Sequence, residues 1–403
     1  MISRRSFLAA AAAGSCGLFG GARGAPAINA PGVSDTEIRI GQTMPYSGPQ
    51  SPFGVIGRAE AAYFRMINEK GGVSGRKIGL ISLDDSYIPA RTIEQTRRLV
   101  EEEGVAFIFG SFGDPTNLAA RQYLNDARIP QLLLAALAET VVDPERYPWT
   151  TTLHNSASSE ARVYAKYIAA TKPDAKIGVL YEKSSAYRML GTWIRQGLGD
   201  GAGPAIVSEA PCQASDPTVD SQIIDLQASG ADTLIIGASP KAAAKAIRKA
   251  YDIGWTPDRY IGNSASSIVA VMKPAGVEKA KGVVSAAYLK DPTDPRWKDD
   301  PGIREWQAFA AKYLSPADVT DQYAFYGCHV AMVLTHVLTQ CGGDLSRDNI
   351  LRQALSIRDF ATPMLLPGIS VNTSPTDYVP IRQFQLERFN GENWELFGGV
   401  LGG

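Results

Sequence analysis

The stretch IRIGQTMPYSGPQSPFG at 38–54 continues as VIGRAEAAYFRMINEKGGVSG at 55–75 and RKIGLISLDD at 76–85. An acidic segment follows, and VAFIFG at 105–110 closes the stretch. Its apolar residues change twice from the period of a strand to the period of a helix and back. This pattern predicts a right-handed βαβαβ unit built on a parallel sheet.

Two loops of this unit are the first candidates for a ligand site. Ligands of open parallel sheets bind beyond the carboxyl ends of the strands, where the loops gather. The loops at 44–54 and 111–117 both follow such strand ends. We therefore expect both loops to border a binding site.

The alternation of strands and helices restarts after residue 150, which indicates a second lobe of similar size. Three helical segments then precede two C-terminal strands, for which Asn390-Gly391 predicts a tight hairpin turn. The expected fold is α/β, with two doubly wound parallel-sheet lobes joined by a multi-strand hinge. Repeated crossings between the lobes predict a cleft that closes on a ligand. The expected division assigns 36–150 and 290–378 to the first lobe, and 151–289 and 379–403 to the second.

Residues 1–27 are expected to be an export signal. The segment SRRSFL at 3–8 precedes an alanine-rich run, which is similar to a twin-arginine signal, and APA at 25–27 offers a cleavage site. Cys16 lies in a poor lipoprotein box, so a lipid anchor is the less favoured alternative. Beyond this segment, no stretch holds the roughly 18 uncharged apolar residues that a membrane span needs. We expect an exported, periplasmic protein.

Composition narrows the function further. A net charge of −1 without a charge run argues against a nucleic-acid partner or a polybasic membrane surface. The sequence contains no P-loop and no nucleophile elbow, and we expect no cofactor. His329 and His336 can share a helix face but lack further ligands at suitable spacing, so no metal site is expected. The cysteines at 212, 328 and 341 have no disulfide spacing and are expected to be buried hydrophobes.

The order and spacing of several short motifs resemble the type I periplasmic solute-binding proteins of the leucine/isoleucine/valine-binding family. The matching motifs are IRIG at 38–41, YSGP at 46–49, NEKGGVSG at 68–75, VAFIFG at 105–110 and AFYG at 324–327. The resemblance covers nearly the whole mature chain. It implies a two-lobed receptor that captures a small solute, without chemistry, and passes it to the membrane permease of an ATP-driven importer. We expect it to work as a monomer.

The resemblance also implies ligand contacts. On the first lobe they fall on Phe53, Asp114, Ala136 and Ala138, and Thr116 in the first turn of the same helix as Asp114 joins them. On the second lobe they fall on Ala186, Ser239 and Ser264, and a late-helix aromatic falls on Tyr326.

Three of these positions depart from the amino-acid-binding pattern of the family. The glutamate that receives a ligand ammonium falls on Ser264, and two tyrosines fall on Ala186 and Ser239. Tyr187, next to one vacated position and at the start of a helix expected over 187–198, is expected to replace one of these rings. These departures argue against a branched-chain amino acid as the ligand.

Asp114 departs in charge, because the family carries a hydroxyl where helix N–H groups accept a ligand carboxylate. Asp114-Pro115 also predicts a cap of its own helix. Either role places a negative charge at the anion site. The hypothesis is a ligand that offers a donor or a cationic group, such as an amide or an amine.

The sequence thus predicts an exported solute-binding protein for an amino acid or a related small polar organic solute. An aromatic acid is the alternative, because LPGISVNTSPTD at 366–377 looks like one subfamily of these proteins. An exported enzyme that uses the cleft is a more distant alternative, which the missing catalytic constellation disfavours.

Overall fold

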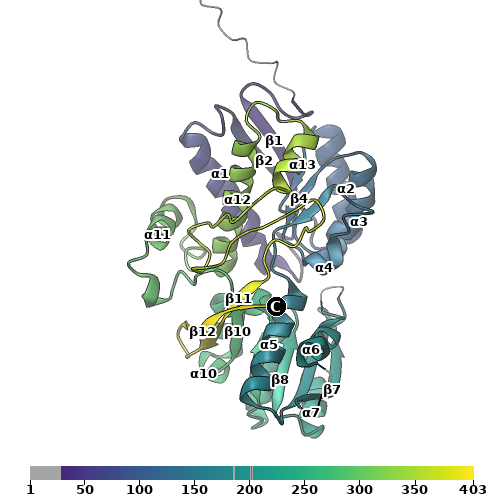
Figure 1. Cartoon of the computed structure of the whole chain (residues 1–403), viewed down its shortest axis with the longest axis vertical. Coiled ribbons are helices and arrows are strands. Elements are labelled where there is room, and N and C mark those ends of the chain that lie inside the picture. The colour runs from purple at the N-terminus through teal and green to yellow at the C-terminus, as the bar shows by residue number, and fades with distance from the viewer. Residues whose placement is uncertain (1–28, 185–186, 200, 202) are drawn as a thin grey trace, which may run out of the picture.

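The computed structural model describes residues 29–403, apart from 185, 186, 200 and 202. The chain forms two α/β lobes, each built on its own sheet, and the elements of one lobe lie above those of the other in Figure 1. The predicted export signal lies outside the described residues. No helix in the described part is both long and apolar enough to cross a bilayer.

The first sheet is parallel throughout and has the strand order β2-β1-β3-β4-β5. Its fully buried apolar side chains include Ile38 and Ile40, as the alternating strand pattern predicted. The strands are β1 (Glu37–Met44), β2 (Lys77–Asp84), β3 (Ile108–Phe109), β4 (Gln131–Leu134) and β5 (Thr150–Thr152).

Helices from both halves of the chain pack around this sheet. Helix α1 buries Ile56, Ala59 and Tyr63, and it ends before Gly71 and Gly72, which both adopt positive φ. The helices are α1 (Gly54–Glu69), α2 (Pro89–Arg97), α3 (Asp114–Asp126), α4 (Ala138–Val141), α11 (Pro301–Tyr313), α12 (Gln322–Gln340) and α13 (Arg347–Ala354). Helix α12 lies against α1, so the late part of the chain completes the first lobe.

The second sheet has the order β12-β11-β10-β9-β8-β6-β7. Strands β6 to β10 pair in parallel, whereas β11 pairs antiparallel with both β10 and β12. The strands are β6 (Lys176–Glu182), β7 (Ala205–Cys212), β8 (Thr233–Gly237), β9 (Asp258–Ile261), β10 (Val284–Ala287), β11 (Gln383–Phe389) and β12 (Trp394–Gly402). The helices are α5 (Ala157–Thr171), α6 (Leu190–Leu198), α7 (Asp220–Ala228), α8 (Pro240–Asp252), α9 (Lys273–Ala275) and α10 (Val277–Ala280).

The chain crosses between the two sheets after β5, after β10 and before β11. Hydrogen bonds tie these crossing segments together. Ser156 N–H donates to the carbonyl of Ile381 over 3.0 Å, and Leu366 N–H donates to the carbonyl of Tyr288 over 2.9 Å. Three connected crossings form the kind of joint about which two lobes can close.

Most predicted elements are confirmed, including the α/β class, and four details differ. The second sheet is mixed rather than parallel, because the C-terminal hairpin adds two antiparallel strands. That hairpin has a four-residue loop at 390–393, since Phe389 pairs with Trp394. Helix α6 begins at Leu190 and leaves Tyr187 in the preceding turn. Strand β5, which the sequence pattern missed, spans the predicted lobe boundary at 150/151. The cysteines at 212, 328 and 341 are buried and unpaired, as expected.

Substitution of Gly327 tests the close approach of α1 and α12. A methyl group at Gly327 would lie 2.6 Å from the backbone carbonyl oxygen of Ile56, so the two helices would have to separate. We expect Gly327→Ala to lower the free energy of unfolding by about 1–3 kcal/mol in urea denaturation. Gly191→Ala in α6 is the control, since its methyl would meet only the movable carboxylate of Glu209. Equal stability of Gly327→Ala and the parent would contradict the close packing.

Candidate ligand-binding site

Both sheets reverse their strand order beside their first strand. Strand β1 lies between β2 and β3, and β6 lies between β7 and β8. The loops that follow β1 and β3 therefore leave the first sheet in opposite directions and open a crevice, and the loops after β6 and β8 do the same in the second. The binding site is expected where these two crevices face each other.

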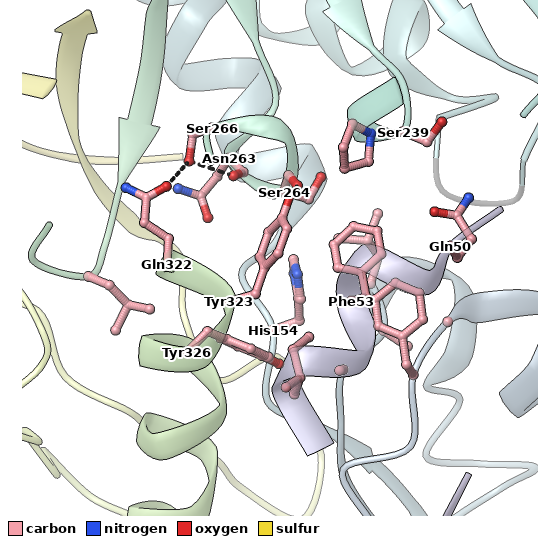
Figure 2. Close-up of a pocket in the computed structure, with 18 of the residues that line it drawn as sticks. Gln50, Phe53, His154, Ser239, Asn263, Ser264, Ser266, Gln322, Tyr323 and Tyr326 are labelled. Atoms are coloured by element: carbon pink, nitrogen blue, oxygen red, sulfur yellow. Dashed lines mark hydrogen bonds between the residues drawn. The ribbon is translucent and has the colours of Figure 1, made fainter. Parts of the chain in front are cut away.

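One cavity occupies this place, and residues of both lobes line it. It holds about 1110 Å³ of space, including its open mouth. Phe53 follows β1, Asp114 follows β3, Tyr187 follows β6 and Ser239 follows β8, so each of the four loops contributes a lining residue. Figure 2 shows Gln50 and Ser239 toward one end of the cavity and Gln322 and Ser266 toward the other.

Aromatic rings form much of the wall. Phe53 stacks on Phe112, with ring centroids 4.3 Å apart, and its ring lies 4.7 Å from that of Tyr323 (Figure 2). Tyr87 continues this wall, 5.8 Å from Phe112. Such a wall offers flat apolar surfaces and ring faces that attract a cation.

Tyr187 and Ser264 come from different loops of the second lobe and meet at the cavity. Their hydroxyl oxygens lie 2.5 Å apart, and the Tyr323 hydroxyl of α12 donates to the backbone carbonyl of Ser264 over 2.8 Å. This second hydrogen bond joins α12 to the second lobe. The resemblance had placed a glutamate and a tyrosine near these positions, and here two hydroxyl groups hold each other.

Asp114 does not cap its own helix, so that prediction is wrong. The residue at the N-cap position of α3 is Gly113, at φ +93°, which has no side chain to cap the helix. The Asp114 carboxylate instead accepts the N–H of Leu137 over 3.0 Å and the hydroxyl of Thr140 over 2.7 Å. It thus holds the start of α4 while lining the cavity.

Two further carboxyl groups line the cavity from the second lobe. Glu182, at the end of β6, accepts the N–H of Ser239 over 3.0 Å. Glu387 on β11 is only 3% exposed, and its side chain makes no hydrogen bond with any described residue. Burial, together with the nearby charges of Asp291, Glu160 and Asp294, raises the pKa of Glu387 well above its ordinary value.

Glu160 holds a buried network behind the second-lobe wall. Its carboxyl group accepts the N–H of Asn263 over 2.6 Å and the side-chain amide of Asn155 over 2.9 Å. The Tyr164 hydroxyl lies 2.7 Å from both Glu160 and the carbonyl of Ile261, but it has only one hydrogen to donate. A proton on Glu160 resolves this shortage, and burial raises the pKa of Glu160 to about 7.

The structure brings seven of the nine predicted site residues to this cavity: Phe53, Asp114, Ala136, Tyr187, Ser239, Ser264 and Tyr326. Thr116 is fully buried and is not among the cavity-lining residues, and its hydroxyl donates to the carbonyl of Phe112 over 2.6 Å, with the carbonyl of Gly113 3.0 Å away. Ala138 begins α4, beside the cavity residue Leu137. Ala186, which the resemblance also implied, lies outside the described residues.

Tyr326 and His154 line a part of the cavity wall that offers few polar groups to a ligand. The Tyr326 hydroxyl donates to the carbonyl of Leu153 over 2.7 Å, so its ring face rather than its hydroxyl is available (Figure 2). Burial lowers the pKa of His154 to about 4, so this residue is neutral at pH 7.

The sequence reasoning missed several lining residues, among them Tyr87, Phe112, Glu182, Tyr323 and Glu387. Signals existed for two of them. Tyr323 lies one helical turn before Tyr326, and Glu182 directly follows a buried strand. Glu387 offered none, because a glutamate in an alternating strand normally faces water.

The two lobes and the lined cavity between them define a bilobed ligand-binding protein. The profile of the family described as periplasmic binding protein matches residues 37–391, and the chain belongs to this family. Proteins of this family bind small ligands and work with the permeases of ABC transporters.

Curated relatives are of the Leu/Ile/Val-binding type. Leu/Ile/Val-binding protein homolog 7 of Brucella abortus is 28% identical over 291 residues, which are 70% of this chain and 72% of that protein. Homolog 8 of the same species is 25% identical, over 69% of this chain and 71% of its own length.

Solved structures share the fold at lower identity. A branched-chain amino acid ABC transporter protein from Thermus thermophilus with bound valine has a TM-score of 0.82 at 16% identity and covers 92% of this chain and 98% of its own. A fatty acid ABC transporter substrate-binding protein from Thermomonospora curvata has a TM-score of 0.78 at 20% identity and covers 94% of this chain and 95% of its own.

The pKa of Glu160 leads to a pH-dependent stability. A carboxyl group whose pKa is raised on folding binds its proton more tightly in the folded state than in the unfolded state. Its contribution to the free energy of unfolding therefore falls as the pH rises from the unfolded-state pKa, about 4.3, to the folded-state pKa. We expect the free energy of unfolding of the parent to fall by about 2 kcal/mol relative to Glu160→Gln between pH 5 and pH 8.

Urea denaturation of the parent and of Glu160→Gln across this pH range measures the difference between their free energies of unfolding. The titration of other groups cancels in this difference because both proteins share them. Glu102→Gln on the exposed surface is the control and should run parallel to the parent. Parallel curves for Glu160→Gln and the parent would show that Glu160 is ionised in the folded protein.

Proposed function

We propose that this protein is exported, captures a small organic solute in the cavity between its lobes, and delivers it to the permease of an ABC importer. One observation carries the proposal: a single cavity receives lining residues from the switch-point loops of both sheets. A solute held there contacts both lobes at once, which favours their closure around it. The permease can then distinguish the closed form from the open one.

The proposed solute is an amino acid or a related small polar organic compound. The names of the Brucella relatives support a Leu/Ile/Val-type ligand in general terms. The valine-bound and fatty-acid proteins share only the fold with this chain, and their names differ in ligand, so neither supports a particular solute. An aromatic solute is the second candidate, because rings such as Phe53, Phe112 and Tyr323 offer stacking faces.

The proposed ligand contacts are the seven predicted residues on the cavity wall, from Phe53 to Tyr326. The lobe division is likewise part of the proposal, with the first boundary moved to follow β5 at Thr152. Residues 1–27 are proposed as the export signal of the twin-arginine type. A monomer is sufficient for this function.

A thermal-shift screen tests the proposed function. The screen contains solutes of four classes, which are amino acids, amides, amines and aromatic acids. A true ligand at a hundred times its dissociation constant should stabilise the protein by about 2.7 kcal/mol. Ser239→Trp places a large ring in the cavity, at a half-buried position, and should weaken the binding at least roughly tenfold.

Ser221→Trp on the exposed surface of α7 is the matched control and should bind like the parent. Circular dichroism establishes that both variants fold. Stabilisation that survives Ser239→Trp unchanged would contradict binding in the cavity, and no stabilisation by any class would contradict the proposed function.

A further inference from the structure

The end of the cavity at α3 is closed to a ligand carboxylate. A side-chain carbon built on Gly113, at the start of α3, would overlap the ring of Tyr87, so this ring covers the start of the helix. The backbones of Tyr87 and Ser86 have positive φ angles of 61° and 52°, which residues other than glycine rarely adopt. The helix N–H groups that would attract an anion therefore lie beneath an aromatic ring and beside the carboxylate of Asp114.

The charged side chains of the cavity wall are mostly acidic. Asp114 comes from the first lobe and Glu182 from the second, and Glu387 is a third carboxyl group, whose pKa is raised by burial so that its neutral form is favoured. Lys290 is the one lysine or arginine among the described lining residues, and its ammonium group already donates to Asp300 over 2.7 Å and to the carbonyl of Pro363 over 2.9 Å. An anionic solute would therefore meet repulsion without an available cationic partner.

The carboxylates of Asp114 and Glu182 affect the pKa of the same two tyrosine hydroxyl groups. Burial raises the pKa of Tyr87 and of Tyr187, and both carboxylates add to each of these shifts. Both acidic groups line the cavity from opposite lobes, and the ring of Tyr87 lies against Gly113, next to Asp114. The ring of Tyr87 and the neighbouring ring of Phe112 provide faces that attract a desolvated cation.

Glu387 independently indicates a hydrogen-bond donor on the ligand, at a part of the cavity away from Glu182, because three strands lie between β11 and β6. This carboxyl group is 3% exposed, lines the cavity, and has no hydrogen-bond partner among the described residues. Buried carboxyl groups are normally hydrogen-bonded, so one that faces a cavity without a partner points to a ligand that supplies it. An N–H donor satisfies a carboxyl oxygen in either protonation state.

We infer that the cavity takes an organic cation, an amine or amidine with an apolar body, whose N–H groups are received by Glu182 and Asp114. This inference rests on the proposed function and narrows its substrate class from amino acids and related compounds to amines and amidines without a carboxylate. The apolar body lies along the ring wall of Phe53 and Tyr323, and a carboxylate on the cationic end has no favourable position.

Competition among solutes that differ in charge tests this inference. The full mature chain is dialysed against an equimolar pool of amines, amidines, amino acids, carboxylates and neutral amides, and retained compounds are identified by mass spectrometry. The pool contains phenethylamine, phenylalanine and 3-phenylpropionate, which differ only in their charged groups. We expect retained compounds to be cations without a carboxylate, and phenethylamine to exceed its two analogues.

The retained cation is then titrated calorimetrically into variants. Glu182→Gln keeps an oxygen for the Ser239 N–H but removes the charge, and it should weaken binding roughly 10- to 100-fold. Glu278→Gln on the exposed surface of α10 is the control and should change nothing. An unchanged affinity in Glu182→Gln would overturn the inference.

The remaining outcomes separate the two proposals. Retention of an amino acid, a carboxylate or a neutral amide in preference to every cation would overturn the cationic class but leave a solute-binding function intact. Retention of no compound from any class would overturn the proposed function and this inference together.

Discussion

The position of one strand in each sheet governs the rest of the structure. Since β1 has neighbours on both sides that follow it in the chain, its loop and that of β3 must diverge, and the same holds for β6 and β8. Backbone hydrogen bonding therefore creates two crevices before any side chain is considered. The tied crossings between the lobes bring these crevices face to face, and the ligand cavity is the space that results.

The cavity wall is held by polar groups that serve the fold and the site at once. Asp114 holds the start of α4, Glu182 receives an N–H at the start of α8, and Glu160 positions the backbone of Asn263. Their desolvation is offset by these hydrogen bonds. Such groups are rigid before a ligand arrives, so the binding energy is not spent on arranging them. Glu387 is the exception, since its carboxyl group makes no hydrogen bond with any described residue and its backbone alone contributes to the sheet.

The sequence predicted the fold better than the chemistry of the site. Apolar patterning located β1, α1 and α12 because most of each element is buried, and the loops with Phe53 and Asp114 followed from the rule for parallel sheets. Asp114 was expected to cap α3, because Asp-Pro at a helix start is a strong local signal. Its carboxylate instead accepts the N–H of Leu137, which lies 23 residues further on and directly precedes α4. The role of Glu387 depends on strand pairing near the end of the chain, which local patterns do not reveal.

The structure of the protein with its captured solute tests the central claim most directly. Density for the solute is expected between the lobes, in contact with the ring of Phe53 on one side and with Glu182 on the other. A nitrogen atom of the solute should lie about 3 Å from a carboxylate oxygen of Glu182. A solute bound outside the cavity, or held by only one lobe, would contradict the account.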